Sequence, residues 1–197
     1  VAVKKILEPF LPVPVIEEIG GVYHLNYDRP QTIGRVRSFY GQFLVALKAL
    51  AYILSLGPEG IKEMAETAVL NSNYIRKNLQ GWYELKYDTP TLHECVFSDK
   101  YQREYGVTNL DISKRLLDYG LHPPTMSFPL IVHGALMIEP TETESRRDLD
   151  LFIEAMKAIA REAKENPDLL RTAPHITYVR RLDEVQAARN PILRWEK

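Results

Sequence analysis

The side chains with the most versatile chemistry in this chain are five histidines and one cysteine: His24, His93, His122, His133, His175 and Cys95. No two histidines stand three or four residues apart beside a carboxylate, as a helical metal site would need, so we expect no metal. His93 and Cys95 would share one face of a strand, where a thiolate pair could form. Because nothing nearby supplies a third group, we favour a buried, inert thiol.

A polar segment, "RPQTIGRVR", is a candidate anion site. It places the Thr32 hydroxyl, the small Gly34 and the forked donors of Arg29, Arg35 and Arg37 just before a long helical pattern, which suits a phosphate. The alternative is a capped helix start with solvated arginines. We favour that alternative from these residues alone, because arginine near a helix N-terminus opposes the helix dipole.

A second polar segment, "HPPTMSFP", could form a rigid loop. His122 lies between a helix stop and two prolines, which favours a solvent-facing or ligand-facing role, and Thr125 and Ser127 could point hydroxyls at a small polar ligand. The alternative is simply the start of a strand. His133, in the apolar run that follows, is interpreted as a satisfied core or strand-end histidine. Neither segment provides a complete catalytic set.

Composition limits the function classes. The 197 residues are 45% hydrophobic and 26% charged, with 25 basic and 26 acidic side chains, which is typical of a globular protein. This balance argues against a nucleic-acid or membrane-surface partner. The single cysteine and the absence of a long apolar run favour a cytoplasmic protein. Because "VAVKKILEPFLPVP" lacks an initiator Met, we expect a fragment or a processed product.

Two helices are expected in the first half of the chain. Large apolar residues recur at helical spacing and predict a buried amphipathic helix that ends at Gly57-Pro58: Phe39, Phe43, Leu47, Leu50 and Leu54. A second helix from about 59 to 79 has a narrower face of small residues and ends at Gly81. The segment around Pro90 then predicts two strands, or one strand and an irregular edge.

The second half of the chain alternates helix and strand. Thr108 or Asn109 should cap a helix that ends at Gly120, with its inward face formed by Ile112, Leu116 and Tyr119. Residues 128–138 predict a strand buried on both faces. Thr141 or Thr143 should cap a last helix that ends near residues 166–167. We therefore expect an α+β domain with helices on one face of a small sheet.

Five long segments carry a family resemblance. They are "KKILEPFLPVP", "YDRPQTIGRVRSFYGQF", "LGPEGIKEMAETAVLNSNYI", "GLHPPTMSFPLIVHGALMIEPTETES" and "APHITYVRRLDEVQAARNPILRW". Together they resemble the carboxy-terminal part of the glycine dehydrogenase (decarboxylating) subunit 2 family, the P-protein β subunits of the glycine cleavage system. The resemblance covers essentially the whole chain.

The resemblance implies a pyridoxal-phosphate enzyme of fold type I. Residues 1–36 would be the connection from a missing large domain, 37–166 an α+β C-terminal domain, and 167–197 an apolar tail that docks on its own domain or on a partner chain. The full protein would decarboxylate glycine and pass the aminomethyl group to the lipoyl arm of H-protein. Its implied partners are the P-protein α subunit, in a heterotetramer, and lipoylated H-protein.

The resemblance also places the Schiff-base lysine outside this chain. The family carries that lysine in a His-Lys pair upstream of the segment that matches "VAVKKILEPFLP", and no histidine here is followed by lysine. Lys4 and Lys5 are interpreted as ordinary surface residues. We therefore expect no catalytic residue in this chain and no activity of the fragment alone.

Finally, the resemblance gives the two polar segments roles. Thr32, with the amides of Ile33 and Gly34, becomes the candidate contact to a neighbouring protomer's cofactor phosphate, together with Arg35. The resemblance also places His122, Thr125 and Ser127 on the substrate side, near glycine and the lipoyl arm. Two alternatives remain: a non-catalytic α+β interaction module that retains the fold, and an enzyme that acts on another small amino acid with the same cofactor.

Overall fold

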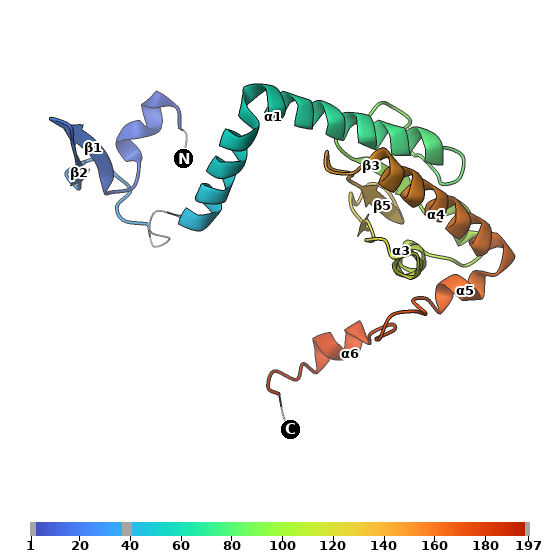
Figure 1. The fold of residues 1–197 in the computed structure, drawn as a ribbon. Helices are drawn as coiled ribbons and strands as arrows, with labels where there is room; N and C mark the ends of the chain where they lie inside the picture. The colour runs from blue at the N-terminus through green and yellow to red at the C-terminus, as the bar shows by residue number, and fades with distance from the viewer. Residues whose placement is uncertain (1–2, 37–40, 196–197) are drawn as a thin grey trace. The chain divides into compact units, whose positions relative to one another are not determined.

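A computed structural model describes residues 3–36 and 41–195 of the chain (Figure 1). The chain divides into two compact units, Val1–Gly57 and Pro58–Lys197, and each is described by itself. The limits 1–36, 37–166 and 167–197, expected from the resemblance, concern the domains of the whole family protein. They stay a prediction.

The first unit consists of short local elements. A 3-10 helix, η1 (Lys5–Phe10), precedes two antiparallel strands, β1 (Val15–Ile19) and β2 (Val22–Asn26). Gly20 and Gly21 join the strands with φ angles of 60° and 83°, which glycine adopts without steric cost. None of the described side chains in residues 3–36 and 41–57 is buried, so this part of the chain has no core of its own.

Helix α1 (Phe43–Leu79) contains both helices expected in the first half of the chain. Gly57, with a φ of 66°, interrupts it just before Pro58, at the predicted break. The predicted burial of the first part is wrong, because its apolar side chains are exposed: Phe43, Leu47, Leu50 and Leu54. The physical reason is that the first unit offers no second layer to cover them. Phe39 lies outside the described residues.

By length and composition, α1 is the one helix in the described part of the chain that could cross a membrane. The uninterrupted run from Phe43 to Leu56, at 1.5 Å per residue, is about 21 Å long, whereas a hydrocarbon core is about 30 Å thick. After the break, Ala68, Ile75 and Leu79 are buried within the second unit. The apolar window before the break is itself exposed in the structure. The expectation of no membrane partner stays a prediction.

The second unit contains a three-stranded antiparallel sheet. Its strands are β3 (Cys95–Ser98), β4 (Thr125–Met126) and β5 (Ala135–Ile138), in the order β3-β5-β4. Cys95 pairs with Ile138, and Phe97 with Leu136. Because paired residues in an antiparallel ladder point to the same face, these four buried side chains form one apolar face of the sheet.

Helices pack against that apolar face (Figure 1). The remaining helices are α2 (Lys100–Arg103), α3 (Asn109–Asp118), α4 (Arg146–Glu165), α5 (Pro167–Arg171) and α6 (Glu184–Arg189). The core joins the sheet to α1, α3 and α4 through Ile75, Leu79, Ile112, Leu116, Leu149, Ile153, Met156 and Ile159. The expected α+β architecture is confirmed.

Helix α3 begins and ends as predicted. Thr108 caps it, and its backbone N–H donates to the Asp111 carboxylate at 2.8 Å in a capping box. Gly120 follows the helix with a φ of 71°. The inward position predicted for Tyr119 is wrong, because this side chain is 38% exposed. Its hydroxyl donates to Glu162 Oε1 at 2.7 Å, so the ring lies along the surface between two helices.

The predicted strand over residues 128–138 is wrong in its first half. Only residues 135–138 pair as β5. Ser127 and Gly134 have φ angles of 65° and 64°, which are incompatible with a strand, and Pro129 has no N–H to donate. Residues 127–134 therefore form a loop. Around Pro90, the alternative of one strand and an irregular edge is confirmed, because β3 follows an irregular segment. Isolated bridges join Gln80 to Tyr83 and Glu84 to Ser98.

Helix α4 begins two residues later than a cap at Thr143 implies, and four residues later than a cap at Thr141 implies. Neither Thr141 nor Thr143 caps it, and their hydroxyls lie 2.7 Å apart, hydrogen-bonded to each other. Ser145 is the cap, in a capping box with Asp148. The reason is the spacing: Ser145 and Asp148 satisfy two donors reciprocally at the first helical turn. The helix ends before Pro167, as predicted.

The tail after α5 is attached to α3 by polar contacts. The amides of His175 and Ile176 donate to Asp118 Oδ1 at 2.6 and 3.0 Å. Arg181 donates to Asp111 Oδ1 at 2.7 Å and to two carbonyls near α5. Beyond this point the large apolar side chains are exposed: Leu182, Val185, Ile192, Leu193 and Trp195.

Candidate functional site

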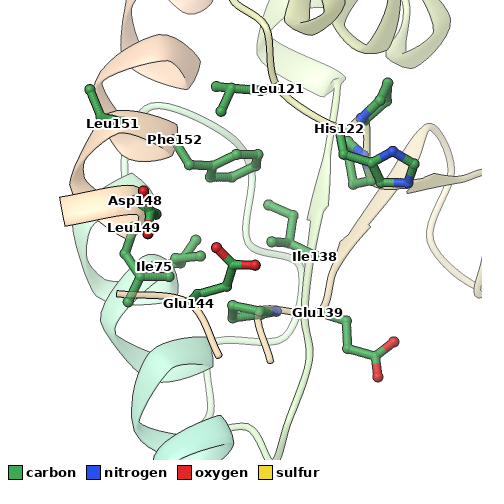
Figure 2. Close-up of a pocket in the computed structure, with 13 residues that line it drawn as sticks. Ile75, Leu121, His122, Ile138, Glu139, Glu144, Asp148, Leu149, Leu151 and Phe152 are labelled. Carbon is green, nitrogen blue, oxygen red and sulfur yellow. The ribbon is translucent and has the colours of Figure 1, made fainter. Parts of the chain in front are cut away.

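A cavity of about 250 Å³ opens at one end of the sheet in the second unit (Figure 2). It forms because α3 stops before Gly120 and β5 stops at Ile138, so that two chain turns leave a hollow beside the start of α4. Apolar side chains supply most of its lining: Ile75, Leu121, Ile138, Leu149, Leu151 and Phe152. A group bound here would be largely shielded from water on one side.

Polar groups stand around this apolar floor. His122, Glu139, Glu144 and Asp148 all line the cavity. In Figure 2 the Glu144 carboxylate points toward Phe152 and Ile138, whereas Glu139 points away. Within the described residues, the Glu144 side chain makes no hydrogen bond or ion pair. Glu144 is therefore the acceptor that an incoming donor could use without displacing an existing bond.

Asp148 is a less available carboxylate. It accepts hydrogen bonds from Ser145 Oγ at 2.5 Å and from the Ser145 amide at 3.2 Å. The hydroxyl and the amide, together with the charge of Arg147, hold the pKa of Asp148 below its ordinary value of 3.8. Asp148 thus stays charged as the partner of the Ser145 cap, with Oδ2 accepting both bonds, and it adds negative potential to the cavity.

The three predicted substrate-side residues do not meet in one cavity. Among them only His122 lines the cavity of Figure 2. Thr125 lies exposed on β4, paired with Met137. Ser127 follows it, and its hydroxyl faces Asn109 Nδ2 at 3.3 Å. The roles of these three residues stay predictions, and the structure separates His122 from the other two.

The segment predicted to contact a phosphate lies in the first unit. Here the donors of Thr32, Ile33 and Gly34 are already used: the Thr32 hydroxyl donates to the Leu11 carbonyl at 2.5 Å, the Ile33 amide to the Phe10 carbonyl at 3.1 Å and the Gly34 amide to Thr32 Oγ1 at 3.1 Å. A phosphate could take these donors only after the internal bonds had broken.

Arginine side chains flank this segment. The Arg35 guanidinium lies 5.0 Å from the centre of the Tyr27 ring, a cation–π distance, and no hydrogen bond or ion pair within the described residues uses its donors. Arg29 forms an ion pair with Glu8 and also donates to the Glu8 carbonyl at 2.8 Å. Arg37 lies outside the described residues. Of the predicted phosphate contacts, Arg35 is the one that fits an anion in this conformation.

A buried carboxylate escaped the sequence interpretation. Asp99, directly after β3, is fully buried, and its Oδ2 accepts from the Asn109 amide at 2.7 Å and from Arg103 at 2.8 Å. Its Oδ1 has no hydrogen-bond partner in the described part of the chain and lies beneath Gly134. The available signal was a carboxylate immediately after an apolar strand. Arg103 is only four residues away, but Asn109 is ten residues away and Gly134 lies on the far side of α3 and β4.

Arg103 also reaches His133. Arg103 Nη1 lies 3.2 Å from His133 Nε2. Because a guanidinium only donates, we assign His133 Nε2 as the acceptor and place the imidazole proton on Nδ1. His133 is exposed just before β5, so the strand-end interpretation applies to it and the core interpretation does not.

Cys95 is an inert thiol, as expected. It is fully buried, and burial raises its pKa to about 12, which disfavours the reactive thiolate. His93 lies on the exposed segment before β3, with Nε2 4.0 Å from Glu94, and forms no pair with the thiol. Among the residues that the structure describes, no group of three histidine, cysteine or carboxylate side chains could hold a metal ion.

A comparison with known protein families identifies the family of this chain. Residues 64–175 match the sequence model of a family described as "Glycine dehydrogenase, C-terminal domain". This range includes the sheet, α3, α4 and the whole lining of the cavity. The chain belongs to that family.

Two curated relatives are similar along the whole chain. "Probable glycine dehydrogenase (decarboxylating) subunit 2" of Caldanaerobacter subterraneus subsp. tengcongensis is 57% identical over 197 residues, which are 100% of this chain and 41% of the relative. The protein of the same name in Bacillus cytotoxicus is 54% identical over 197 residues, and 40% of it is covered. The chain thus spans about two fifths of the length of these relatives.

A solved structure has a similar fold. It is a crystal structure of "glycine decarboxylase (P-protein) of the glycine cleavage system, in inhibitor-bound form". The TM-score is 0.65 at 20% identity, and the match covers 80% of this chain and 38% of that one. At this identity the likeness supports the fold alone. The family resemblance found in the sequence is confirmed.

Proposed function

We propose that this chain is the carboxy-terminal part of a subunit of a glycine decarboxylase. The full protein would release carbon dioxide from glycine and transfer the remaining aminomethyl group to the lipoyl arm of H-protein. The observation that carries this proposal is the family match over residues 64–175, which spans the cavity and all of its walls. The names of the two relatives support the same activity.

In this proposal the second unit supplies a wall beside the reacting groups. The apolar floor excludes water from one side, and Glu144 and His122 offer an acceptor and a donor-acceptor group at its edge. Thr125 and Ser127, on the neighbouring edge of the sheet, would contribute hydroxyls from outside the cavity. None of these groups is a nucleophile positioned by a base, so their proposed work is binding and orientation.

The cofactor implied by the family is pyridoxal phosphate, which supplies an electron sink for a carbanion when bound. Its lysine partner is expected outside this chain. Because Thr32, Ile33 and Gly34 donate within the chain, we assign them no step of the reaction. Arg35 could contact the phosphate without loss of an internal hydrogen bond.

The proposed assembly includes a second kind of subunit. The relatives carry the name "subunit 2", which supports a partner subunit 1. We propose a heterotetramer of the two subunits in the cytoplasm, with glycine and lipoylated H-protein as substrates.

The test is the reaction of the full-length protein. Full-length subunit 2 is combined with subunit 1, pyridoxal phosphate, lipoylated H-protein and carboxyl-labelled glycine, and labelled carbon dioxide is measured. We expect release that requires every component, and we expect His122→Ala to reduce it by roughly tenfold or more. His24→Ala removes an exposed imidazole on β2 and serves as the matched control.

Two outcomes would contradict the proposal. An assembled complex that releases no carbon dioxide would favour the alternative of a non-catalytic interaction module. Release from another small amino acid in preference to glycine would favour a different substrate with the same cofactor.

A further inference from the structure

Residues 127–134, here called the apolar loop, expose three large apolar side chains. Phe128 is 55% exposed, Leu130 80% and Ile131 66%. No charged residue lies between Ser127 and Val132. Large contiguous apolar surfaces on soluble proteins commonly mark places where another surface binds.

The backbone of the apolar loop is fixed by hydrogen bonds from several elements. At its start, the Ser127 amide donates to the Ala135 carbonyl at 2.9 Å. Further along, three donors from the region of β3 bind carbonyls of the loop: Lys86 Nζ to Ile131 at 2.6 Å, Ser98 Oγ to His133 at 2.9 Å and the Asp99 amide to Gly134 at 3.1 Å. The apolar side chains are therefore presented by an ordered loop.

An apolar groove continues from the loop. It has a volume of about 320 Å³ and lies beside Val96 of β3, on the face of the sheet opposite the core. Ile131 and Val132 form one side of it, and Tyr87 and Leu92, both exposed, form the other. Loop and groove together make one largely apolar surface, which also includes His93 and Glu94 and which Lys86 borders at Ile131.

We propose that the apolar loop and this groove form a permanent interface with the part of the same polypeptide that lies outside this chain. The inference rests on the proposed function, in which the full-length protein is a subunit 2. The length supports this occupant, because this chain covers 41% of the first relative and a large share of the polypeptide is available to bind here.

The chemistry of the surface supports the same occupant. Obligate interfaces resemble a divided core and are more apolar than transient ones, whose contacts are commonly polar. A surface presented by Phe128, Leu130 and Ile131 on an ordered backbone fits an obligate interface. One consequence is that Ser127, at the beginning of the loop, would lie at the junction between this unit and the rest of the protein.

The test is the accessibility of single cysteines in the full-length protein. Ile131→Cys and, independently, Leu130→Cys are labelled with a maleimide under native conditions, and peptide mass mapping locates the label. Both native side chains are exposed, so neither change removes core packing. Glu165→Cys, at the exposed end of α4, is the matched control.

We expect the cysteines at 130 and 131 to label at least about tenfold more slowly than the control in full-length subunit 2 alone. Equal rates would overturn the inference. Protection that appears only after subunit 1 is added would also overturn it, because the occupant would then be the partner. The carbon dioxide assay separates the two proposals: an active complex with rapid labelling defeats the interface alone, and an inactive complex with slow labelling defeats the function alone.

Discussion

The two units of the chain contain similar apolar residues and use them differently. In the second unit, apolar side chains from α1, α3, α4 and the sheet are buried together in one core. In the first, none of the described side chains is buried, although the start of α1 carries an apolar residue at nearly every position. An apolar helical segment therefore does not determine its own burial, which depends on the other elements that are present to cover it.

The difference also separates two kinds of stability. The second unit has a core that can support cooperative folding by itself. The first unit is held by local contacts, such as the β1-β2 ladder and the ion pair of Arg29 with Glu8. Such contacts are marginal without a buried face. We therefore expect residues 58–197 to dominate the unfolding of this chain.

The largest expected effect comes from removing the same side chain in each unit. Phe97 is 0% exposed and Phe43 is 75% exposed. We expect Phe97→Ala to lower the free energy of unfolding of this chain by about 3 to 5 kcal/mol, from lost burial and a cavity. Phe43→Ala should change it by less than about 0.5 kcal/mol. Urea denaturation measures both changes. Equal losses of unfolding free energy would contradict the conclusion that only the second unit has a core.

A smaller effect should follow from adding one methyl group at Gly134. A Cβ there would lie 2.0 Å from Asp99 Oδ1, and the φ of 64° is already unfavourable for alanine. We expect Gly134→Ala to cost about 3 kcal/mol, from overpacking and backbone strain together. Gly120 has a φ of 71°, and a Cβ there would meet no atom within 4 Å. In Gly120→Ala, backbone strain alone should therefore cost about 1 kcal/mol. Thermal unfolding that ranks the two variants equally would contradict the predicted contact.

The smallest expected effect concerns the attachment of the tail at acid pH. Burial raises the pKa of Asp118, but hydrogen bonds from the amides of Ile176 and His175 and from Arg115 outweigh it and lower the pKa below 3.8. A depressed pKa contributes stability that is present above the ordinary value and is lost as the pH falls through the folded value. We expect faster proteolysis of the tail as the pH falls below 3.8.

Asp118→Asn should flatten that pH dependence, because the amide keeps an acceptor oxygen and loses the charge. Asp168→Asn removes an exposed carboxylate on α5 and should leave the dependence unchanged. A protease active in acid provides the measurement. The same pH profile in both variants would mean that Asp118 does not hold the tail.

The sequence predicts much of the second unit because its signals are local. The cap at Thr108, the stop at Gly120 and the end of α4 before Pro167 each follow from a few neighbouring residues. The prediction of a strand at residues 128–131 was wrong because an apolar run looks the same in a buried strand and in an exposed loop. Only the positions of Ser127 and Gly134 in the left-handed region distinguish the two, and serine does not reveal this in advance.

The candidate site was predictable only in part. His122 follows a helix stop and precedes two prolines, and this local pattern correctly indicated an exposed position, here at a cavity. Glu144 and Asp99 were missed because their surroundings come from segments far away in the sequence. Periodicity describes one element at a time, whereas a cavity is a property of several elements together.

The contact between Asp99 and Gly134 has a consequence for how this sequence can vary. Shortening residue 99 to alanine would make room for a Cβ at position 134, but the Asn109 amide would then lose its acceptor. Retaining the Asp99 carboxylate as the acceptor also retains the steric conflict with a Cβ at position 134. The two positions are therefore constrained together: the Asp99 carboxylate after β3 leaves no room for a side chain at position 134 before β5.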